Sequence, residues 1–102
     1  HYLWETFSDF NSRFYYKAGL RLASLLAHSN RRTEAYSVLH DLQFNHPAFP
    51  EAFHKEVRLR EASSRVDREA LREVVDRGLL YNPEDEMLQA AWQRQKVSEV
   101  AH

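Results

Sequence analysis

The chain contains no cysteine, and this absence excludes disulfide bonds and thiolate metal sites. It also contains only 2 Gly and 3 Pro among its 102 residues. A β-sandwich or β-barrel of this length needs many tight turns, and tight turns favour Gly, Pro and Asn. Because these residues are scarce, we expect a few long helices and no sheet.

An excess of charge of one sign is lacking as well. The sequence has 14 Lys and Arg against 15 Asp and Glu, for a net charge of −1. Nucleic-acid binding draws most of its affinity from neutralised phosphates, so this balance argues against a DNA or RNA partner. No apolar run approaches the roughly 20 residues of a membrane-spanning helix. We therefore expect no membrane span in this segment, while the compartment, cytoplasmic or periplasmic, stays open.

Motifs for catalysis and metal binding are not found in the sequence. There is no GxSxG, no Gly-rich phosphate loop and no HExxH. A zinc site built from His40, His46 and His54 would need the fold to bring them together. Most carboxylates stand beside Arg on the same predicted helix, which is typical of a solvated ion-pair face. We expect a protein that is not an enzyme and that holds no cofactor or metal.

Apolar spacing and helix-boundary residues predict the helices. The N-terminal segment 2–16 is aromatic-rich, and its stripe either packs on the next helix or forms an exposed surface for a dimer or partner. That stripe consists of Leu3, Phe7, Phe10 and Phe14. Further helices are predicted over 13–28, 31–45, 51–63, 67–80 and 84–100. We also expect the chain to be a segment of a larger protein, because it begins at His1 and not at Met.

Individual residues are expected to mark the ends of these helices. Asn30 and Asn82 would cap the helices that follow them. Pro50 suits a first helical turn. Ser64 and Asp67 are three apart, like a capping box. His46-Pro47 would end the second of these helices, since the residue before Pro is pushed out of the α region.

Each helix has an expected inward face. In the first two helices, the residues expected to face inward are Ala18, Leu22, Leu25 and Leu26 of 13–28, and Ala35, Leu39 and Leu42 of 31–45. In the last two, they are Ala70, Leu71, Val74, Val75 and Leu79 of 67–80, and Met87, Leu88, Ala91 and Trp92 of 84–100. The second half of the last helix is polar and is expected to be solvated.

Helix 51–63 is the weakest, with Phe53, Val57 and Leu59 as its main apolar positions. Glu56 and Arg60 fall on its apolar face, four residues apart in the favourable order for an ion pair. They are interpreted as a paired charge at the edge of a shallow interface, or alternatively as a pair that faces a partner.

Two long spacings indicate an internal repeat. Asn45-His46-Pro47 and Tyr81-Asn82-Pro83 both end a predicted helix, 36 residues apart, and helix pairs at such a period are typical of repeat arrays. A set of residues in the first copy resembles the tetratricopeptide signature: Gly19, Leu22-Ala23, Leu26, Ala35, Leu39 and Pro47. Gly19 in an aromatic slot and Leu42 in a small-residue slot depart from it. The second copy is degenerate and needs one or two inserted residues near 63–66; it uses Phe53, Val57, Leu71, Val75, Gly78 and Pro83, with Glu56 where Leu is expected.

The resemblance implies an all-α fold of antiparallel helix-turn-helix pairs, stacked as a short tetratricopeptide-like α-solenoid of about five to six helices. Residues 1–102 would form one domain. It would comprise the N-terminal helix 1–15, a first repeat at 16–47, a degenerate second repeat at 48–83 and a capping helix at 84–102.

The same resemblance implies a non-catalytic scaffold for a protein or peptide partner. In this family the first helix of each pair lines the groove, which points to Lys17, Leu20, Ser24 and His28 in the first pair and to His54 and Arg58 in the second. These residues favour an acidic partner with an apolar anchor at Leu20, although Glu51 and Glu61 oppose that field. Segments of this family occur inside larger assemblies, including bacterial secretion and exopolysaccharide machines, but no residue here points to that context. The alternative is a structural module that forms a homo-oligomer through the aromatic stripe and Trp92.

Overall fold

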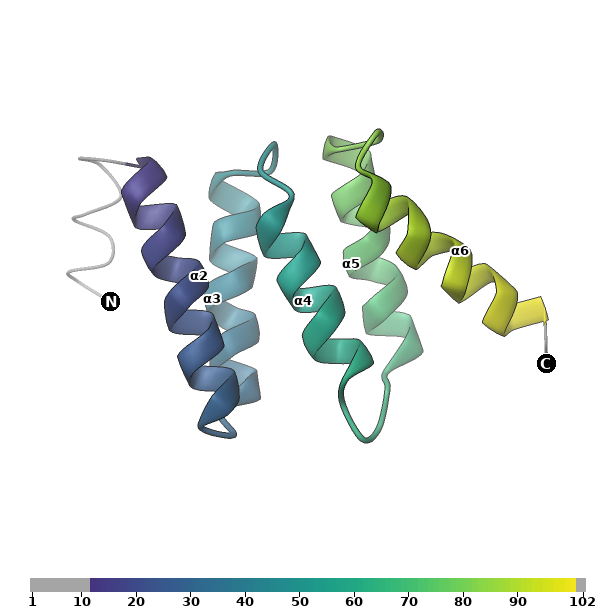
Figure 1. Cartoon of the computed structure of the whole chain (residues 1–102), viewed down its shortest axis with the longest axis horizontal. Helices are drawn as coiled ribbons and strands as arrows, with labels where there is room; N and C mark the ends of the chain where they lie inside the picture. The colour runs from purple at the N-terminus through teal and green to yellow at the C-terminus, as the bar shows by residue number, and fades with distance from the viewer. Residues whose placement is uncertain (1–11, 101–102) are drawn as a thin grey trace. The chain divides into compact units, whose positions relative to one another are not determined.

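The computed structural model describes residues 12–100, and they form five helices with no strand (Figure 1). The helices are α2 (Ser12–His28), α3 (Arg32–Asn45), α4 (Glu51–Glu61), α5 (Arg68–Tyr81) and α6 (Glu86–Val100). The all-α prediction is confirmed, and each predicted helix over 13–100 is present within a few residues of its expected bounds. The stripe residues Leu3, Phe7 and Phe10 lie outside the described residues, as does the side chain of Phe14.

The chain divides into two compact units, an N-terminal unit (His1–His46) and a C-terminal unit (Pro47–His102). The N-terminal unit contains the antiparallel pair α2 and α3, and the C-terminal unit contains the antiparallel pair α4 and α5 together with α6 (Figure 1). The division falls one residue before the expected boundary between the two repeats.

The turn between α2 and α3 differs from the prediction. Asn30 does not cap α3, since Arg31 is the N-cap residue and makes no side-chain cap bond. Asn30 instead adopts a left-handed conformation with φ of 60°, which Asn tolerates better than most residues. The Arg31 N–H then donates to the Leu26 carbonyl at 2.8 Å and closes the end of α2.

The inward face of α3 is as predicted, but that of α2 is not. Ala35, Leu39 and Leu42 are buried, whereas Leu22 is 40% exposed and Leu25 is 59% exposed. Ala18 is exposed too, and Leu26 is partly so. Among residues 16–28 of α2, the buried positions are Tyr16, Gly19 and Ala23. Small residues at the crossing let two helix backbones approach closely, and this turns the leucines of α2 to the flank of the pair.

The C-terminal unit has a continuous apolar core supplied by all three of its helices. It consists of Phe53, Val57, Leu71, Val74, Val75, Leu88 and Ala91, with Leu79 packed against it. Gly78 lies where α5 meets its neighbours: a Cβ there would stand 2.7 Å from Leu88 Cδ1 and 3.1 Å from Phe53 Cγ. Its lack of a side chain therefore allows the close packing of α4 and α6 on α5.

The helix caps of the C-terminal unit use aspartates. The Asp67 carboxylate accepts from the Ala70 N–H at 3.1 Å and caps α5. The expected cap of α6, Asn82, is instead the C-cap of α5. The cap role at α6 falls to Asp85, which accepts from the Leu88 N–H at 2.9 Å, because Pro83 and Glu84 form a turn before the helix begins. Pro50, expected in a first helical turn, is the N-cap residue of α4.

The polar residues of α4 and α6 also depart from expectation. The ion pair of Glu56 and Arg60 forms, with 2.7 Å between Arg60 Nε and Glu56 Oε2, but Glu56 is fully buried and not at an edge. Gln95 is buried within the half of α6 that was expected to be solvated. Trp92 is 38% exposed, and its ring lies under Lys96, with Nζ 4.9 Å from the ring centroid.

Candidate functional site

Four of the predicted partner-binding residues lie along one face of α2. Lys17 and His28 are exposed, and Leu20 and Ser24 are half-buried. Their spacing of three, four and four residues forms a stripe about 16 Å long at the helical rise. We call these four residues the α2 stripe. It runs beside the buried positions Gly19 and Ala23, so the stripe is separate from the face that packs on α3.

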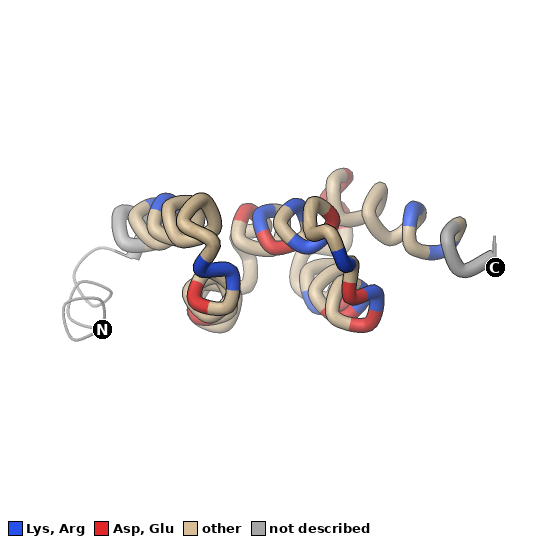
Figure 2. The backbone as a smooth tube through the Cα atoms, turned by 90° about the horizontal axis from the view of Figure 1, so that it is seen from below, with Lys and Arg blue, Asp and Glu red and all other residues tan. Residues whose placement is uncertain are grey.

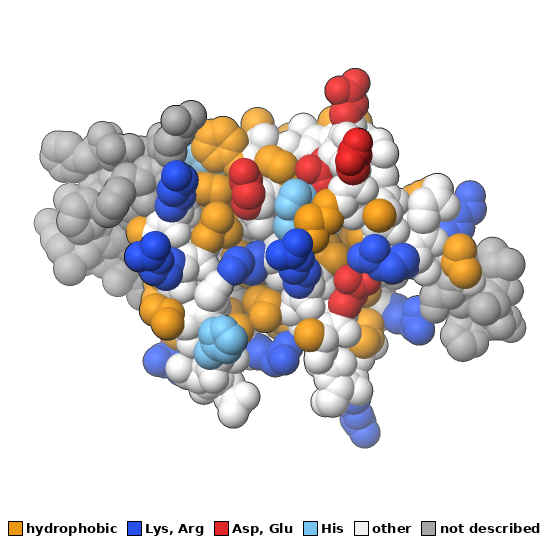
Figure 3. Space-filling view, viewed as in Figure 1, with side chains coloured by type: hydrophobic (Ala, Val, Ile, Leu, Met, Phe, Trp, Pro, Cys, Tyr) orange, Lys and Arg blue, Asp and Glu red, His pale blue; other side chains and the backbone are white. Residues whose placement is uncertain are grey.

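The centre of the stripe is formed by the apolar Leu20 and the hydrogen-bonded Ser24, and one end carries the cation Lys17. The Ser24 hydroxyl donates to the Leu20 carbonyl at 3.2 Å, which fixes this side chain along the helix. α2 contains no Asp or Glu, whereas Lys17 and Arg21 are both exposed on it. Basic and apolar side chains alternate over the visible face of this unit (Figure 3). The stripe can therefore attract a carboxylate next to an apolar contact at Leu20.

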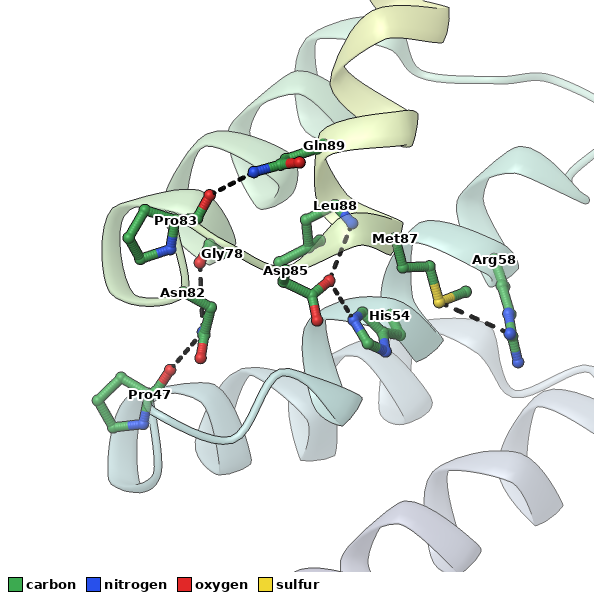
Figure 4. Close-up of polar contacts among 10 residues, drawn as sticks. All are labelled: Pro47, His54, Arg58, Gly78, Asn82, Pro83, Asp85, Met87, Leu88 and Gln89. Atoms are coloured by element: carbon green, nitrogen blue, oxygen red, sulfur yellow. Dashed lines mark hydrogen bonds and ion pairs between the residues drawn. The ribbon is translucent and has the colours of Figure 1, made fainter.

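The other two predicted residues, His54 and Arg58, belong to the C-terminal unit and point toward α6 (Figure 4). His54 Nε2 lies 2.6 Å from Asp85 Oδ2. Since a carboxylate only accepts, Nε2 carries the proton in this contact. Arg58 Nη2 lies 3.7 Å from Met87 Sδ. His54 thus has an internal partner, while Arg58 stays exposed and makes only a weak contact.

Sequence reasoning singled out Asn82 as a helix cap, but it missed Asp85 and the contacts by which both residues organise this end of the C-terminal unit. Asp85 both caps α6 and binds His54, and it therefore joins α4 to α6. Asn82 Nδ2 donates to the Pro47 carbonyl at 2.8 Å, and it also lies 3.2 Å from the Gly78 carbonyl (Figure 4). In the sequence, the only signal for the contact between Asn82 and Pro47 was that a Pro follows both His46 and Asn82.

Charges elsewhere in the C-terminal unit compensate one another. Acidic and basic positions are interspersed along α4 and α5 (Figure 2). Glu61 of α4 binds Arg94 of α6, with 3.0 Å between Glu61 Oε1 and Arg94 Nη2. With Glu56 paired to Arg60, these contacts leave no single-sign face along α4.

Among the side chains that the structure describes, no group of three or more His, Asp or Glu is arranged to hold a metal ion. Within residues 12–100, no helix has the length and apolar character needed to cross a membrane. Comparison with known proteins finds no matching family model, no similar curated protein and no similar solved structure.

Proposed function

We propose that the chain is a non-catalytic scaffold that binds an acidic protein or peptide segment through the α2 stripe. The observation that carries the proposal is a basic, acid-free helix whose stripe lies off its packed face. Such a helix offers an apolar contact at Leu20 beside the cation Lys17. Charge complementarity of this kind favours carboxylate-bearing partners and rejects basic ones.

We further propose that the helix pairs are tetratricopeptide-like repeats. Support comes from the ends of α3 and α5, which lie 36 residues apart and share one backbone geometry. His46 has φ −136° and ψ 62°, and its N–H donates to the Leu42 carbonyl at 2.8 Å. Asn82 has φ −134° and ψ 65°, and its N–H donates to the Gly78 carbonyl at 2.8 Å. A Pro follows in both places, as a repeating unit requires.

The connections within the two pairs agree with this register. Residues 29–31 join α2 to α3, whereas residues 62–67 join α4 to α5. The second pair thus has extra residues in the region where its degenerate signature needed an insertion. In repeat proteins, stacked pairs present first-helix residues to partners, which is the role assigned here to α2.

The test is affinity capture with the full chain, followed by measurement of the dissociation constant for the partner that is identified. Lys17→Glu should weaken binding about tenfold, because it replaces an attraction with a repulsion. Arg58→Glu tests separately whether α4 contributes. Arg65→Glu, at an exposed position between α4 and α5, makes the same charge change outside the stripe and should leave binding unchanged. If Lys17→Glu binds the same partner as tightly as Arg65→Glu, the stripe is not the site.

An oligomerisation module is the second candidate, and exposed apolar side chains favour it. Phe44 is 87% exposed near the end of α3, and Leu80 is 73% exposed at the equivalent place near the end of α5. Large exposed apolar residues often mark interfaces. Light scattering over a range of concentrations would show a rising mass for such a module, and Phe44→Ser with Leu80→Ser should abolish the rise.

A further inference from the structure

A groove lies on the opposite flank of α2 from the stripe. It has a volume of about 330 Å³ and lies between α2 and α3, with Leu22, Leu26 and Val38 among its lining residues. At 100° per residue, the buried positions Gly19 and Ala23 separate Leu22 and Leu26 from the stripe. The turn of the α2 leucines away from the core, described above, is what gives this groove its apolar lining. Its size is at the small end of the range for ligand pockets, which suits a side-chain anchor.

The charged residues of the groove carry a net negative charge. Arg31 forms two bonds with Glu34, Nε to Oε1 at 2.7 Å and Nη2 to Oε2 at 2.5 Å. This hydrogen bonding and the charge of Glu34 raise the pKa of Arg31, so that the two groups neutralise each other in place. Asp41 also lines the groove and is exposed, and its carboxylate has no partner among the side chains of the described residues. One uncompensated carboxylate therefore stands beside an apolar lining.

We propose that this groove docks a partner segment with a large apolar anchor next to a Lys or Arg. The anchor would contact Leu22, Leu26 and Val38, and the cation would pair with Asp41. Burial of the apolar side chains supplies affinity. The pairing with Asp41 supplies the preference for a basic segment. This surface is distinct from the α2 stripe in both position and charge, so it does not depend on the function proposed above.

The experiment uses the full chain labelled with nitrogen-15 and a short synthetic amphipathic peptide. The peptide carries Leu at positions i and i+4, each followed by Lys, and its twin carries Glu in place of every Lys. We expect the Lys peptide to shift the backbone amide signals of Leu22, Leu26, Val38 and Asp41 in a titration. We expect the Glu twin to leave those signals in place.

Matched variants locate the contact. Asp41→Lys should weaken binding of the Lys peptide about tenfold, whereas Asp76→Lys, an exposed aspartate of α5, should change it by less than about twofold. Leu26→Ser should also weaken binding, while Leu25→Ser, an exposed leucine outside the groove lining, should not. Melting curves of all four variants check that each is folded. Lys17→Glu should leave binding of this peptide within about twofold, so the two proposals can fail separately.

Three outcomes would overturn the proposal. The first is that neither peptide binds. The second is that the Glu twin binds as tightly as the Lys peptide. The third is that Asp76→Lys weakens binding as much as Asp41→Lys, which would mean that general charge, and not the groove, attracts the peptide.

Discussion

A buried carboxylate destabilises a fold unless a cation and hydrogen bonds accompany it, and Glu56 is the clearest example in this chain. Its side chain is 1% exposed and pairs with Arg60, which is 15% exposed. Removal of Arg60 takes a cationic partner from the buried Glu56 carboxylate, and breaking a buried pair in this way costs up to roughly 3–5 kcal/mol. We therefore expect Arg60→Ala to lower the free energy of unfolding by about that much in urea titrations.

Arg94 provides the matched control for this prediction. It pairs with Glu61 at 3.0 Å, but its side chain is 54% exposed and that of Glu61 is 32% exposed. Exposed pairs contribute about 0–1 kcal/mol, so Arg94→Ala should have little effect. Equal losses of stability in the two variants would show that Glu56 is not buried with its charge paired to Arg60.

Asp85 combines two contacts that are usually made by separate residues. Its carboxylate accepts from the Leu88 N–H and binds His54, whereas Asp67 only caps its own helix at Ala70. Loss of an N-cap costs about 1 kcal/mol. We expect Asp67→Ala to cost about that, and Asp85→Ala to cost a further 1 kcal/mol or so, roughly the value of one hydrogen bond.

His54→Ala separates these two contributions of Asp85. In that background, Asp85→Ala should cost no more than Asp67→Ala, because only the cap remains to be lost. The measurement is a double-mutant cycle of thermal or urea unfolding. A coupling energy of zero between residues 54 and 85 would contradict a stabilising contact between α4 and α6.

At the scale of the helix pair, stability depends on the small residues at the crossing of α2 and α3. Ala35 and Leu39 are both fully buried. Ala35→Leu should overpack the crossing and cost about 1–3 kcal/mol. Leu39→Ala should leave a cavity and cost roughly 2–5 kcal/mol. Val38→Ala, at a partly exposed position of the same helix, should cost less than Leu39→Ala, and unfolding curves that rank the two the other way would show that the register of α3 is wrong.

The helices could be predicted because their signals are local. The ends of the helices are marked by prolines, namely Pro47, Pro50 and Pro83. Their faces are marked by the spacing of apolar residues such as Leu39 and Val75. Both signals lie within a few residues of the helix that they predict. Leucine spacing gave the wrong face for α2, because it favoured Leu22 and Leu26 while close packing on α3 selected Gly19 and Ala23; of these, Ala23 was expected from its small-residue slot in the tetratricopeptide signature. The prediction of Glu56 at an edge was wrong as well, because its burial depends on residues far from it in sequence. Hydrophobicity alone does not predict which side of a helix has the smaller residues and therefore the closer neighbour.

The candidate site, like the fold, could be predicted where the information lies within one helix, and not where it depends on tertiary contacts. The residues of the α2 stripe were assigned from the resemblance to tetratricopeptide repeats. They lie on one face of one helix, and their role in binding a partner stays a prediction. The same resemblance assigned His54 to the partner site. Its bond to Asp85 was not predicted, because that contact depends on the turn at Pro83 and Glu84. The groove beside Leu22 and Leu26 was missed for the same reason as the face of α2.

At the scale of the whole molecule, acidic and basic residues are mixed along the chain, and we expect this mixture to disfavour binding to nucleic acid. Arginines cluster in the sequence between residues 58 and 72, yet acidic residues are interleaved with them, and the net charge of the chain is −1. Arg60 is held by Glu56, and Glu61 is held by Arg94. Because these charges already pair with each other, few cations remain to neutralise phosphates and so to release counterions from a nucleic-acid backbone.

We therefore expect no binding of a fluorescein-labelled DNA duplex or single strand at about 150 mM salt, with any dissociation constant weaker than the roughly 10⁻⁴ M limit of ordinary non-specific binding. The matched variant is Glu69→Lys with Glu73→Lys, two exposed positions of α5 that alternate with Arg68 and Arg72. Because this change removes two compensating charges and adds two cations, the variant should acquire salt-dependent binding in an anisotropy titration. Tight binding by the unmodified chain would show that its arginines form an uncompensated patch, and the partner would then have to be sought among polyanions.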